Sequence, residues 1–187
     1  MTILPRRFYS HDTVTVAKNL LGKKIVRKIG KNEMSGIIVE TEAYRHKDDP
    51  ASHAFRKMTE RNKVMFEEVG ISYVYFTYGM HYCFNIVARD SKFEAGAVLI
   101  RAITPEKGIK MMEKNRHIKD LKRLTDGPAK LTQALRITKK HHGIDLTTNS
   151  ELFITDGVNI HDKIISSPRI GIKNATDRLW NFKTTIK

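Results

Sequence analysis

The amino-acid sequence predicts a single α+β domain, in which a mostly antiparallel, curved β-sheet carries flanking helices and a protruding β-hairpin. Strand-like runs fill the first half of the chain and return near its end, and helical patterns lie between them. This order of elements is typical of an α+β domain. The chain has 187 residues, of which 40% are hydrophobic, which is enough for one substantial core. We therefore expect residues 1–187 to form one domain.

The predicted strands are short runs rich in β-branched and aromatic residues. In chain order they cover residues 24–28, 35–41, 71–78, 81–88, 97–104, 152–155 and 169–172. The segments Gly30-Lys31-Asn32 and Gly79-Met80 have the composition of hairpin turns. We therefore expect two hairpins in the first half of the chain, the second with Gly79 at its tip.

The predicted helices begin at residues that favour helix N-termini. Asp12 is expected to cap a short apolar helix, and Thr59 is expected to cap a helix that runs to Phe66. Two further helices should follow Pro105 and Asp126, in a strongly basic part of the chain.

Positive charge gathers in two segments. The chain has 34 Lys and Arg against 20 Asp and Glu, a formal net charge of +14. Residues 1–32 hold eight basic and one acidic side chain, and residues 105–142 hold eleven and four. Binding to a phosphate backbone requires such clustering, because each neutralised phosphate releases condensed counterions. The charge alone also fits a basic surface attracted to ribosomes or anionic lipid.

The number of cysteines and the hydropathy of the sequence limit the kind of site and the compartment that the protein can have. Cys83 is the only cysteine, which excludes an intramolecular disulfide and a multi-cysteine zinc cluster and fits a reducing compartment. No run approaches 18 apolar residues, and the start of the chain lacks the apolar stretch of a signal peptide. We expect a cytoplasmic protein that does not enter a membrane, with Cys83 in its core.

Two glutamates stand close together in the sequence VETEAY. The alternation of a strand places Glu40, Glu42 and Tyr44 on one face. The glutamates can be salt-bridged residues at a solvated edge, or one of them can be a general base beside a pocket. With Asp48, Asp49 and His53 they can also be read as a divalent metal site, although acidic loop residues at irregular spacing are mostly solvated.

Aromatic residues dominate the predicted second hairpin, YVYFTYGMHYCFN. Tyr75 and Tyr78 have opposite parity on a strand, so their roles should differ. Tyr75 can line a pocket, and Tyr78 beside the turn can wedge between base pairs, but aromatics at this spacing are also typical of cores and cross-strand pairs. Asn85 and Arg101 follow on the next two strands, where an arginine can keep a neighbouring carboxylate ionised or can be an ordinary surface cation.

An ordered series of motifs covers nearly the whole chain. It consists of VETEAY, a histidine nine residues further on, RNKVMF, YVYFTYGMHYCFNI, VLIRA, DGPAKLTQAL and PRIGI. In this order the motifs resemble the alkyladenine (3-methyladenine) DNA glycosylase family. The resemblance implies a monofunctional enzyme of base excision repair, which hydrolyses the N-glycosidic bond of an alkylated or deaminated purine flipped out of double-stranded DNA. It implies no cofactor and no metal, and we expect a monomer.

The resemblance also implies which residues perform the reaction. By matching position, Glu42 is the base that activates water, and Arg101 helps to orient it. Tyr78 is the residue that intercalates into the DNA and fills the gap left by the extruded nucleotide.

Four further residues are implied to contact the extruded base. Tyr44, His53 and Tyr75 form the pocket walls, and Asn85 disfavours unmodified guanine by crowding its exocyclic amine. One departure concerns the loop of residues 54–58, AFRKM, which lacks the glycines usual in the family. This loop is expected to border the DNA or the pocket mouth, so the departure bears on substrate range.

Two other functions fit the same residues. The first is a nucleic-acid-binding module that keeps a base pocket without turnover. The second is a metal-dependent nuclease that uses Glu40, Glu42, Asp48 and Asp49 as metal ligands.

Overall fold

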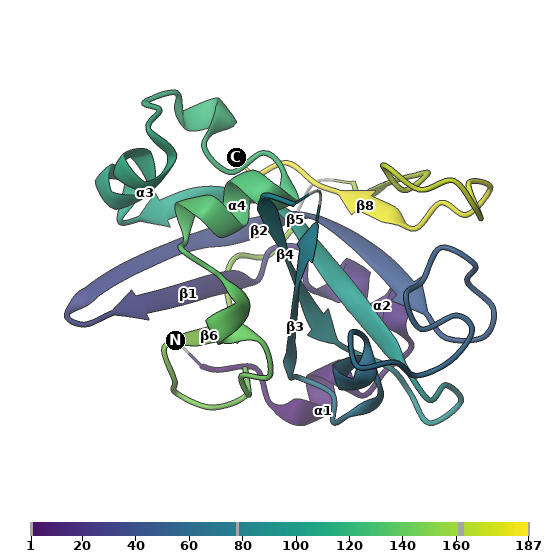
Figure 1. Ribbon diagram of the computed structural model, residues 1–187. Helices are drawn as coiled ribbons and strands as arrows, with labels where there is room; N and C mark the ends of the chain where they lie inside the picture. Colours follow the sequence, from purple (N-terminus) through teal and green to yellow (C-terminus); the bar gives the residue numbers. More distant parts are fainter. Residues whose placement is uncertain (1, 78, 161–162, 187) are drawn as a thin grey trace.

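A curved antiparallel sheet forms the centre of the protein (Figure 1). The computed structural model describes residues 2–77, 79–160 and 163–186. The strands are β1 (Lys24–Ile29), β2 (Asn32–Arg45), β3 (Ser72–Thr77), β4 (His81–Val87), β5 (Gly96–Lys107), β6 (Leu152–Thr155), β7 (Ile165–Ser167) and β8 (Asn181–Lys183). Hydrogen-bonded neighbours follow the order β3-β4-β5-β2-β1-β6, and β8 joins β2 and β7. The predicted α+β class is confirmed.

Short helices cover the sheet and its ends. The α-helices are α1 (Arg6–Tyr9), α2 (Thr13–Asn19), α3 (Ile109–Arg116) and α4 (Pro128–Ala134), and the 3₁₀ helices are η1 (Lys63–Phe66), η2 (Leu121–Arg123) and η3 (Lys139–His141). Helix α2 packs on β2 and β5, and α4 packs on β4 and β5. In the part of the chain that is described, no helix is both long and apolar enough to cross a bilayer.

The main hydrophobic core lies between the sheet and these helices. Its fully buried members come from segments far apart in the sequence and include Val16, Ile38, Phe84, Ile100, Leu131 and Phe182. A smaller cluster around Val64, Met65 and Tyr73 lies beneath the loop that follows β2. The two clusters hold β2 and β5 between the helices and the loop after β2. The pocket described below opens beside this loop.

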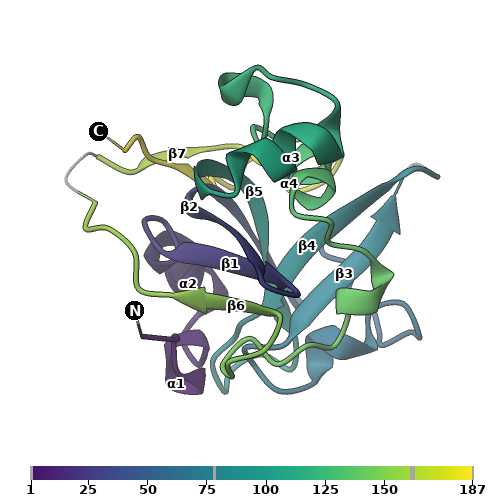
Figure 2. The same ribbon diagram turned by 90° about the vertical axis from the view of Figure 1, so that its left-hand side faces the viewer.

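The second predicted hairpin extends away from the rest of the sheet, formed by β3 and β4 (Figure 2). Gly79 has a φ of +66°, a left-handed conformation that glycine adopts without strain. Two apolar side chains of this hairpin are strongly exposed, Phe76 at 50% and Met80 at 69%. Tyr78 lies outside the described residues. The exposed apolar side chains leave the hairpin with a surface that a partner can cover.

Two local predictions are wrong for the same kind of reason. No α-helix begins at Thr59, because the Asn62 side chain accepts a hydrogen bond from the Thr59 amide and donates to the His53 and Lys57 carbonyls. This side chain holds the backbone in a loop instead of a helix. Residues 169–172 form no strand, because the Arg169 side chain turns inward to an ion pair and fixes the segment as a loop.

Strand β5 also continues further than predicted, through Pro105 to Lys107. Proline lacks the amide hydrogen of a sheet ladder, so the prediction ended the strand at residue 104. The register between β2 and β5 shifts where Gly36 pairs with Pro105, and proline is tolerated at such an irregularity.

The cap of α2 supplies a test of the fold. The Asp12 carboxylate accepts hydrogen bonds from the Val14 and Thr15 amides at 3.0 and 3.2 Å, as predicted, and it also pairs with Arg45 at 2.6 Å. Asp12→Ala should lower the free energy of unfolding by about 1 to 2 kcal/mol, measured by urea denaturation. Asp12→Asn keeps a capping oxygen and should lower it by less. Equal losses in the two variants would contradict the cap.

Candidate active site

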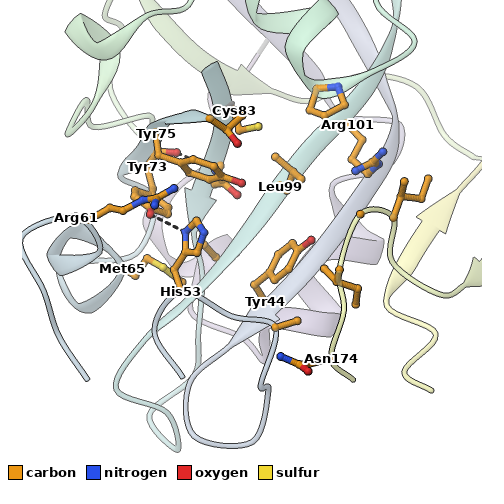
Figure 3. A pocket seen from close by; sticks show the side chains of 18 of the residues that line it. Tyr44, His53, Arg61, Met65, Tyr73, Tyr75, Cys83, Leu99, Arg101 and Asn174 are labelled. Atoms are coloured by element: carbon orange, nitrogen blue, oxygen red, sulfur yellow. Dashed lines mark hydrogen bonds between the residues drawn. The ribbon is translucent and has the colours of Figure 1, made fainter. Parts of the chain in front are cut away.

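A pocket of about 470 Å³ opens beside β2, β4 and β5, between the loop after β2 and the loop after β7 (Figure 3). Its volume falls in the range of small-ligand sites. Residues that line it include Tyr44, Pro50, His53, Arg61, Tyr73, Tyr75, Cys83, Asn85, Leu99, Arg101, Ile170, Lys173 and Asn174. The pocket therefore gathers side chains from positions 44 to 174 of the chain.

Aromatic rings form the walls of this pocket. Tyr44 lies across the pocket from His53 and Tyr75 (Figure 3). The His53 and Tyr75 rings meet edge to face, with their centroids 4.7 Å apart, and the Tyr73 ring is tilted against Tyr75 at 5.3 Å. Opposed aromatic faces of this kind suit a flat ring system that stacks between them.

His53 is held in position by its neighbours and is uncharged at neutral pH. Its Nδ1 lies 2.9 Å from the Tyr73 hydroxyl oxygen. The residue keeps an exposed edge, but desolvation by the surrounding side chains and the charge of Arg61 lower the pKa of His53 to about 4. The His53 wall therefore brings no positive charge to the pocket.

Glu42 has no solvent exposure, and its carboxylate accepts four hydrogen bonds. Oε1 accepts from the Ile170 amide at 2.8 Å and from Asn181 Nδ2 at 3.0 Å. Oε2 accepts from the Tyr44 hydroxyl at 2.8 Å and from Arg101 Nη1 at 3.2 Å. The four donors are therefore a guanidinium group, a phenol and two amide groups.

The Glu42 carboxylate lies directly behind the pocket rather than on its surface. Three of its four partners, Tyr44, Arg101 and Ile170, themselves line the pocket. Burial raises the pKa of the Tyr44 phenol, and the adjacent Glu42 charge raises it further, so this group is a protonated donor. The Tyr44 hydroxyl therefore separates the carboxylate from the pocket.

A bulge in β5 aims Arg101 at the two glutamates. Glu40 pairs with Ala102 and Thr41 pairs with Ile100, so Arg101 is an extra residue on β5. An extra residue of this kind changes the direction of a side chain. Arg101 Nε donates to Glu40 at 2.7 Å, in addition to the bond from Nη1 to Glu42. Burial lowers the pKa of Arg101, but the two carboxylates raise it by more, and the net shift is upward.

Asn85 lines the pocket from β4, where it pairs with Leu99 on β5. The Asn85 side-chain amide donates to the Tyr73 carbonyl at 3.0 Å. This bond fixes the orientation of the amide group. Asn85 therefore presents a rigid polar group to whatever enters between the aromatic walls.

Of the acidic residues considered for a metal site, Glu40 and Glu42 share Arg101 and Asn181, whereas Asp48 and Asp49 bind other arginines. Asp48 binds Arg45, Asp49 binds Arg169, and Glu40 binds Arg101. Among residues 2–77, 79–160 and 163–186, no group of three His, Cys, Asp or Glu is close enough to hold a metal ion. The four carboxylates named in the nuclease hypothesis instead have arginine partners.

The expected site residues include five that line the pocket, but sequence reasoning missed the groups that hold the pocket together. Asn181 and Ile170 bind Glu42, Asn62 fixes the His53 carbonyl, and Arg61 lies 5.4 Å from the centroid of the Tyr75 ring. Asn62 and Ile170 fall within the motifs RNKVMF and PRIGI, so those motifs carried a signal. Asn181 stands in no motif that we identified.

This combination defines a class of protein: a curved antiparallel sheet with an aromatic pocket for a flat ring and a buried carboxylate behind the pocket wall. Comparison with known proteins gives the family. Residues 7–186 match the profile described as methylpurine-DNA glycosylase. The chain therefore belongs to the methylpurine-DNA glycosylase family, which confirms the resemblance found in its motifs.

Individual relatives agree with this assignment over most of their length. A protein of Carboxydothermus hydrogenoformans is 49% identical over 181 residues, covering 96% of this chain and 94% of the relative. A Prosthecochloris aestuarii protein is 47% identical, covering 94% and 84%, and a Clostridium acetobutylicum protein is 42% identical, covering 96% and 92%. Each of the three is named "Putative 3-methyladenine DNA glycosylase".

The lowered pKa of His53 predicts a dependence of stability on pH. Between pH 6.5 and 4, unfolded chains bind a proton at His53 that folded chains do not, so stability falls as the pH falls. Because the ring is partly exposed, we expect this loss to be about 1 kcal/mol. Urea unfolding at pH 6.5 and 4.5 should show a smaller loss in His53→Gln than in the wild type. Parallel losses would contradict the shift.

Proposed function

We propose that the protein is a monofunctional DNA glycosylase, which extrudes an alkylated or deaminated purine from double-stranded DNA and hydrolyses its bond to deoxyribose. The observation that carries this proposal is the buried Glu42 carboxylate directly behind an aromatic pocket. The family and the names of the relatives support the same class of reaction.

The pocket walls favour a purine that has left the base stack. An enzyme cannot reach the glycosidic bond inside the duplex, so the nucleotide must rotate into a shaped site at a cost of a few kcal/mol. Stacking between Tyr44 on one side and His53 with Tyr75 on the other offsets this cost. A purine alkylated at N3 or N7 is cationic, and cation–π contact with tyrosine faces adds about 0.5 to 2 kcal/mol.

The polar groups of the pocket suit hydrolysis by one activated water. In our proposal a water enters beside Glu42 Oε2 by taking the place of the Tyr44 hydroxyl, and Arg101 keeps the carboxylate oriented. The water oxygen bonds to C1′ of the sugar while the bond from C1′ to the base nitrogen breaks. The electron pair leaves with the base, and Glu42 takes the proton of the water.

Two further residues select the damaged base and fill the gap that the extruded nucleotide leaves in the DNA. Asn85 meets the edge of the extruded base and disfavours unmodified guanine by crowding its exocyclic amine. Tyr78 belongs to the connection between β3 and β4, and we propose that it intercalates where the nucleotide was. The exposed Phe76 and Met80, two residues before and after it in the sequence, support an apolar hairpin that meets DNA.

The decisive test replaces Glu42, the proposed general base. Glu42→Gln should lower the single-turnover rate of base release by roughly 10²- to 10⁴-fold, because the amide cannot accept the proton of the water. Release is measured on duplexes that carry 3-methyladenine, 7-methylguanine or hypoxanthine. The control is Glu106→Gln on β5, the strand next to β2, which removes a carboxylate that pairs with Lys24. It should keep wild-type activity.

The same assay separates the competing functions. A binding module without turnover would release no base from any duplex, with either form of Glu42. A metal-dependent nuclease would lose activity in a chelator, whereas base release by Glu42 should persist. Lys173 at the pocket rim is exposed, and a reaction through water predicts no lysine adduct after borohydride treatment.

The hairpin gives a second prediction for the reaction. Tyr78→Ala should lower base release from duplex DNA by about tenfold or more, because the extruded nucleotide can return to the stack when the gap is not filled. Release from the same lesion in single-stranded DNA should change much less, since no stack competes there. A variant with unchanged activity on duplex DNA would remove this role from Tyr78.

A further inference from the structure

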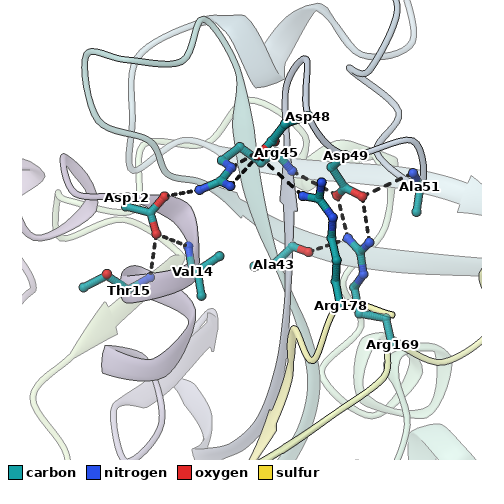
Figure 4. A network of polar contacts seen from close by, with 10 residues as sticks. All are labelled: Asp12, Val14, Thr15, Ala43, Arg45, Asp48, Asp49, Ala51, Arg169 and Arg178. Carbon is teal, nitrogen blue, oxygen red and sulfur yellow. Dashed lines mark hydrogen bonds and ion pairs between the residues drawn. The ribbon is translucent and has the colours of Figure 1, made fainter. Parts of the chain in front are cut away.

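A fully buried ion pair lies behind the pocket, between Arg169 and Asp49 (Figure 4). Both side chains have no solvent exposure. The guanidinium group donates from Nη1 to Oδ2 at 2.5 Å and from Nη2 to Oδ1 at 2.6 Å. Nη1 also donates to the Ala43 carbonyl at 2.8 Å. This paired geometry with a third acceptor requires the flat fork of an arginine.

The ion pair joins the loop after β7 to strand β2 and to the loop that follows β2, which lies 120 residues earlier in the sequence. Asp49 belongs to the loop after β2 and also accepts hydrogen bonds from the Arg45 and Ala51 amides, each at 3.2 Å. Arg169 belongs to the loop after β7, and Ala43 belongs to β2. The pair therefore locks both loops to the strand that carries Glu42.

Arg169 acts on two parts of the site at once. Its guanidinium carbon lies 4.7 Å from the centroid of the Tyr44 ring, which it supports as a pocket wall. The amide of the next residue, Ile170, donates to Glu42 Oε1 at 2.8 Å. If Arg169 moves, the Tyr44 wall loses its support and the Ile170 amide leaves the carboxylate.

The burial of this pair points to positioning rather than stability. Desolvation of two charges offsets most of their attraction, and an apolar pair of similar volume commonly stabilises a fold as well or better. Directional bonds from a guanidinium group, in contrast, fix atoms to a narrow geometry. A reaction is sensitive to such geometry, since displacement by about 1 Å can cost a factor of roughly 10² in rate.

We propose that Arg169 is a positioning residue for the reaction, and that Asp49 holds it in place. Through Ile170 it sets the Glu42 carboxylate, and through ring contact it sets the Tyr44 wall. The kinetic part of this inference rests on the proposed glycosylase function. Neither residue is expected to touch the substrate, because both are buried behind the groups that line the pocket.

The first test measures the melting temperature and the single-turnover rate of a variant that lacks the ion pair. The double variant Arg169→Met and Asp49→Leu replaces the ion pair by an apolar pair, and it should stay folded, with a melting temperature lowered only by the loss of the bonds to the Arg45, Ala51 and Ala43 backbone. Its single-turnover rate at saturating enzyme should fall by about tenfold or more. The DNA concentration for half-saturation should change by less than about twofold, because the DNA-facing surface is unchanged. A wild-type rate in this folded variant would overturn the proposal.

A conservative variant keeps the test decisive if the double variant does not fold. Arg169→Lys retains the charge but cannot make both bonds to Asp49 together with the bond to Ala43. It should fold and should show a rate loss of about fivefold or more, whereas an unchanged rate would overturn the proposal.

The matched control is Arg178→Met. Arg178 also contacts the Trp180 ring and pairs with Asp48 at 3.5 Å, but it has no bond to Glu42 or Tyr44 in the described structure, so its removal should leave the rate unchanged.

A second measurement does not depend on activity. Hydrogen exchange of the Ile170 amide, followed by NMR, should be about tenfold faster in Arg169→Lys than in the wild type, because the bond to Glu42 is loosened. Unchanged protection of this amide would overturn the positioning role. If the wild type released no base, the proposed function would fail, and the Ile170 exchange rate would still decide whether Arg169 positions Glu42.

Discussion

The structure of the site depends on one buried negative charge. A carboxylate without solvent contact is unfavourable unless hydrogen bonds replace its water, and Glu42 has four donors. They come from Tyr44 on β2, Arg101 on β5, Ile170 in the loop after β7 and Asn181 on β8. The sheet order, the β5 bulge and the return of the last strands to β2 all bring these donors to one point.

Much of the fold could be predicted because it follows from short-range patterns. Alternation and turn composition predicted β1 to β6 and both hairpins, with Gly79 in the turn of the second, and residue type predicted the capping role of Asp12, but β7 and β8 were not predicted. The alternation of a strand also placed Glu40, Glu42 and Tyr44 on one face. Their shared contacts agree, since Asn181 binds both glutamates and the Tyr44 hydroxyl binds Glu42.

Other features could not be predicted, because long-range contacts decide them. Asn62 overrides the helical tendency after Thr59 with three bonds from one side chain, and the pattern of apolar residues does not record such bonds. Ile170 and Asn181 reach Glu42 from 128 and 139 residues away. The motifs could place the loop around Ile170 near the site, but neither its ion pair nor the contribution of Asn181 is visible in local sequence.

The position of the last donors in the chain has a consequence for synthesis. Ile170 and Asn181 lie in the final part of the sequence, and β8 pairs with the middle of β2. A nascent chain whose end is still inside the ribosome can form the earlier strands, yet its Glu42 lacks two of four donors. Products of premature termination before residue 168 share this deficiency. The hydrogen bonding of Glu42 is therefore complete only after residue 181 has been added to the chain.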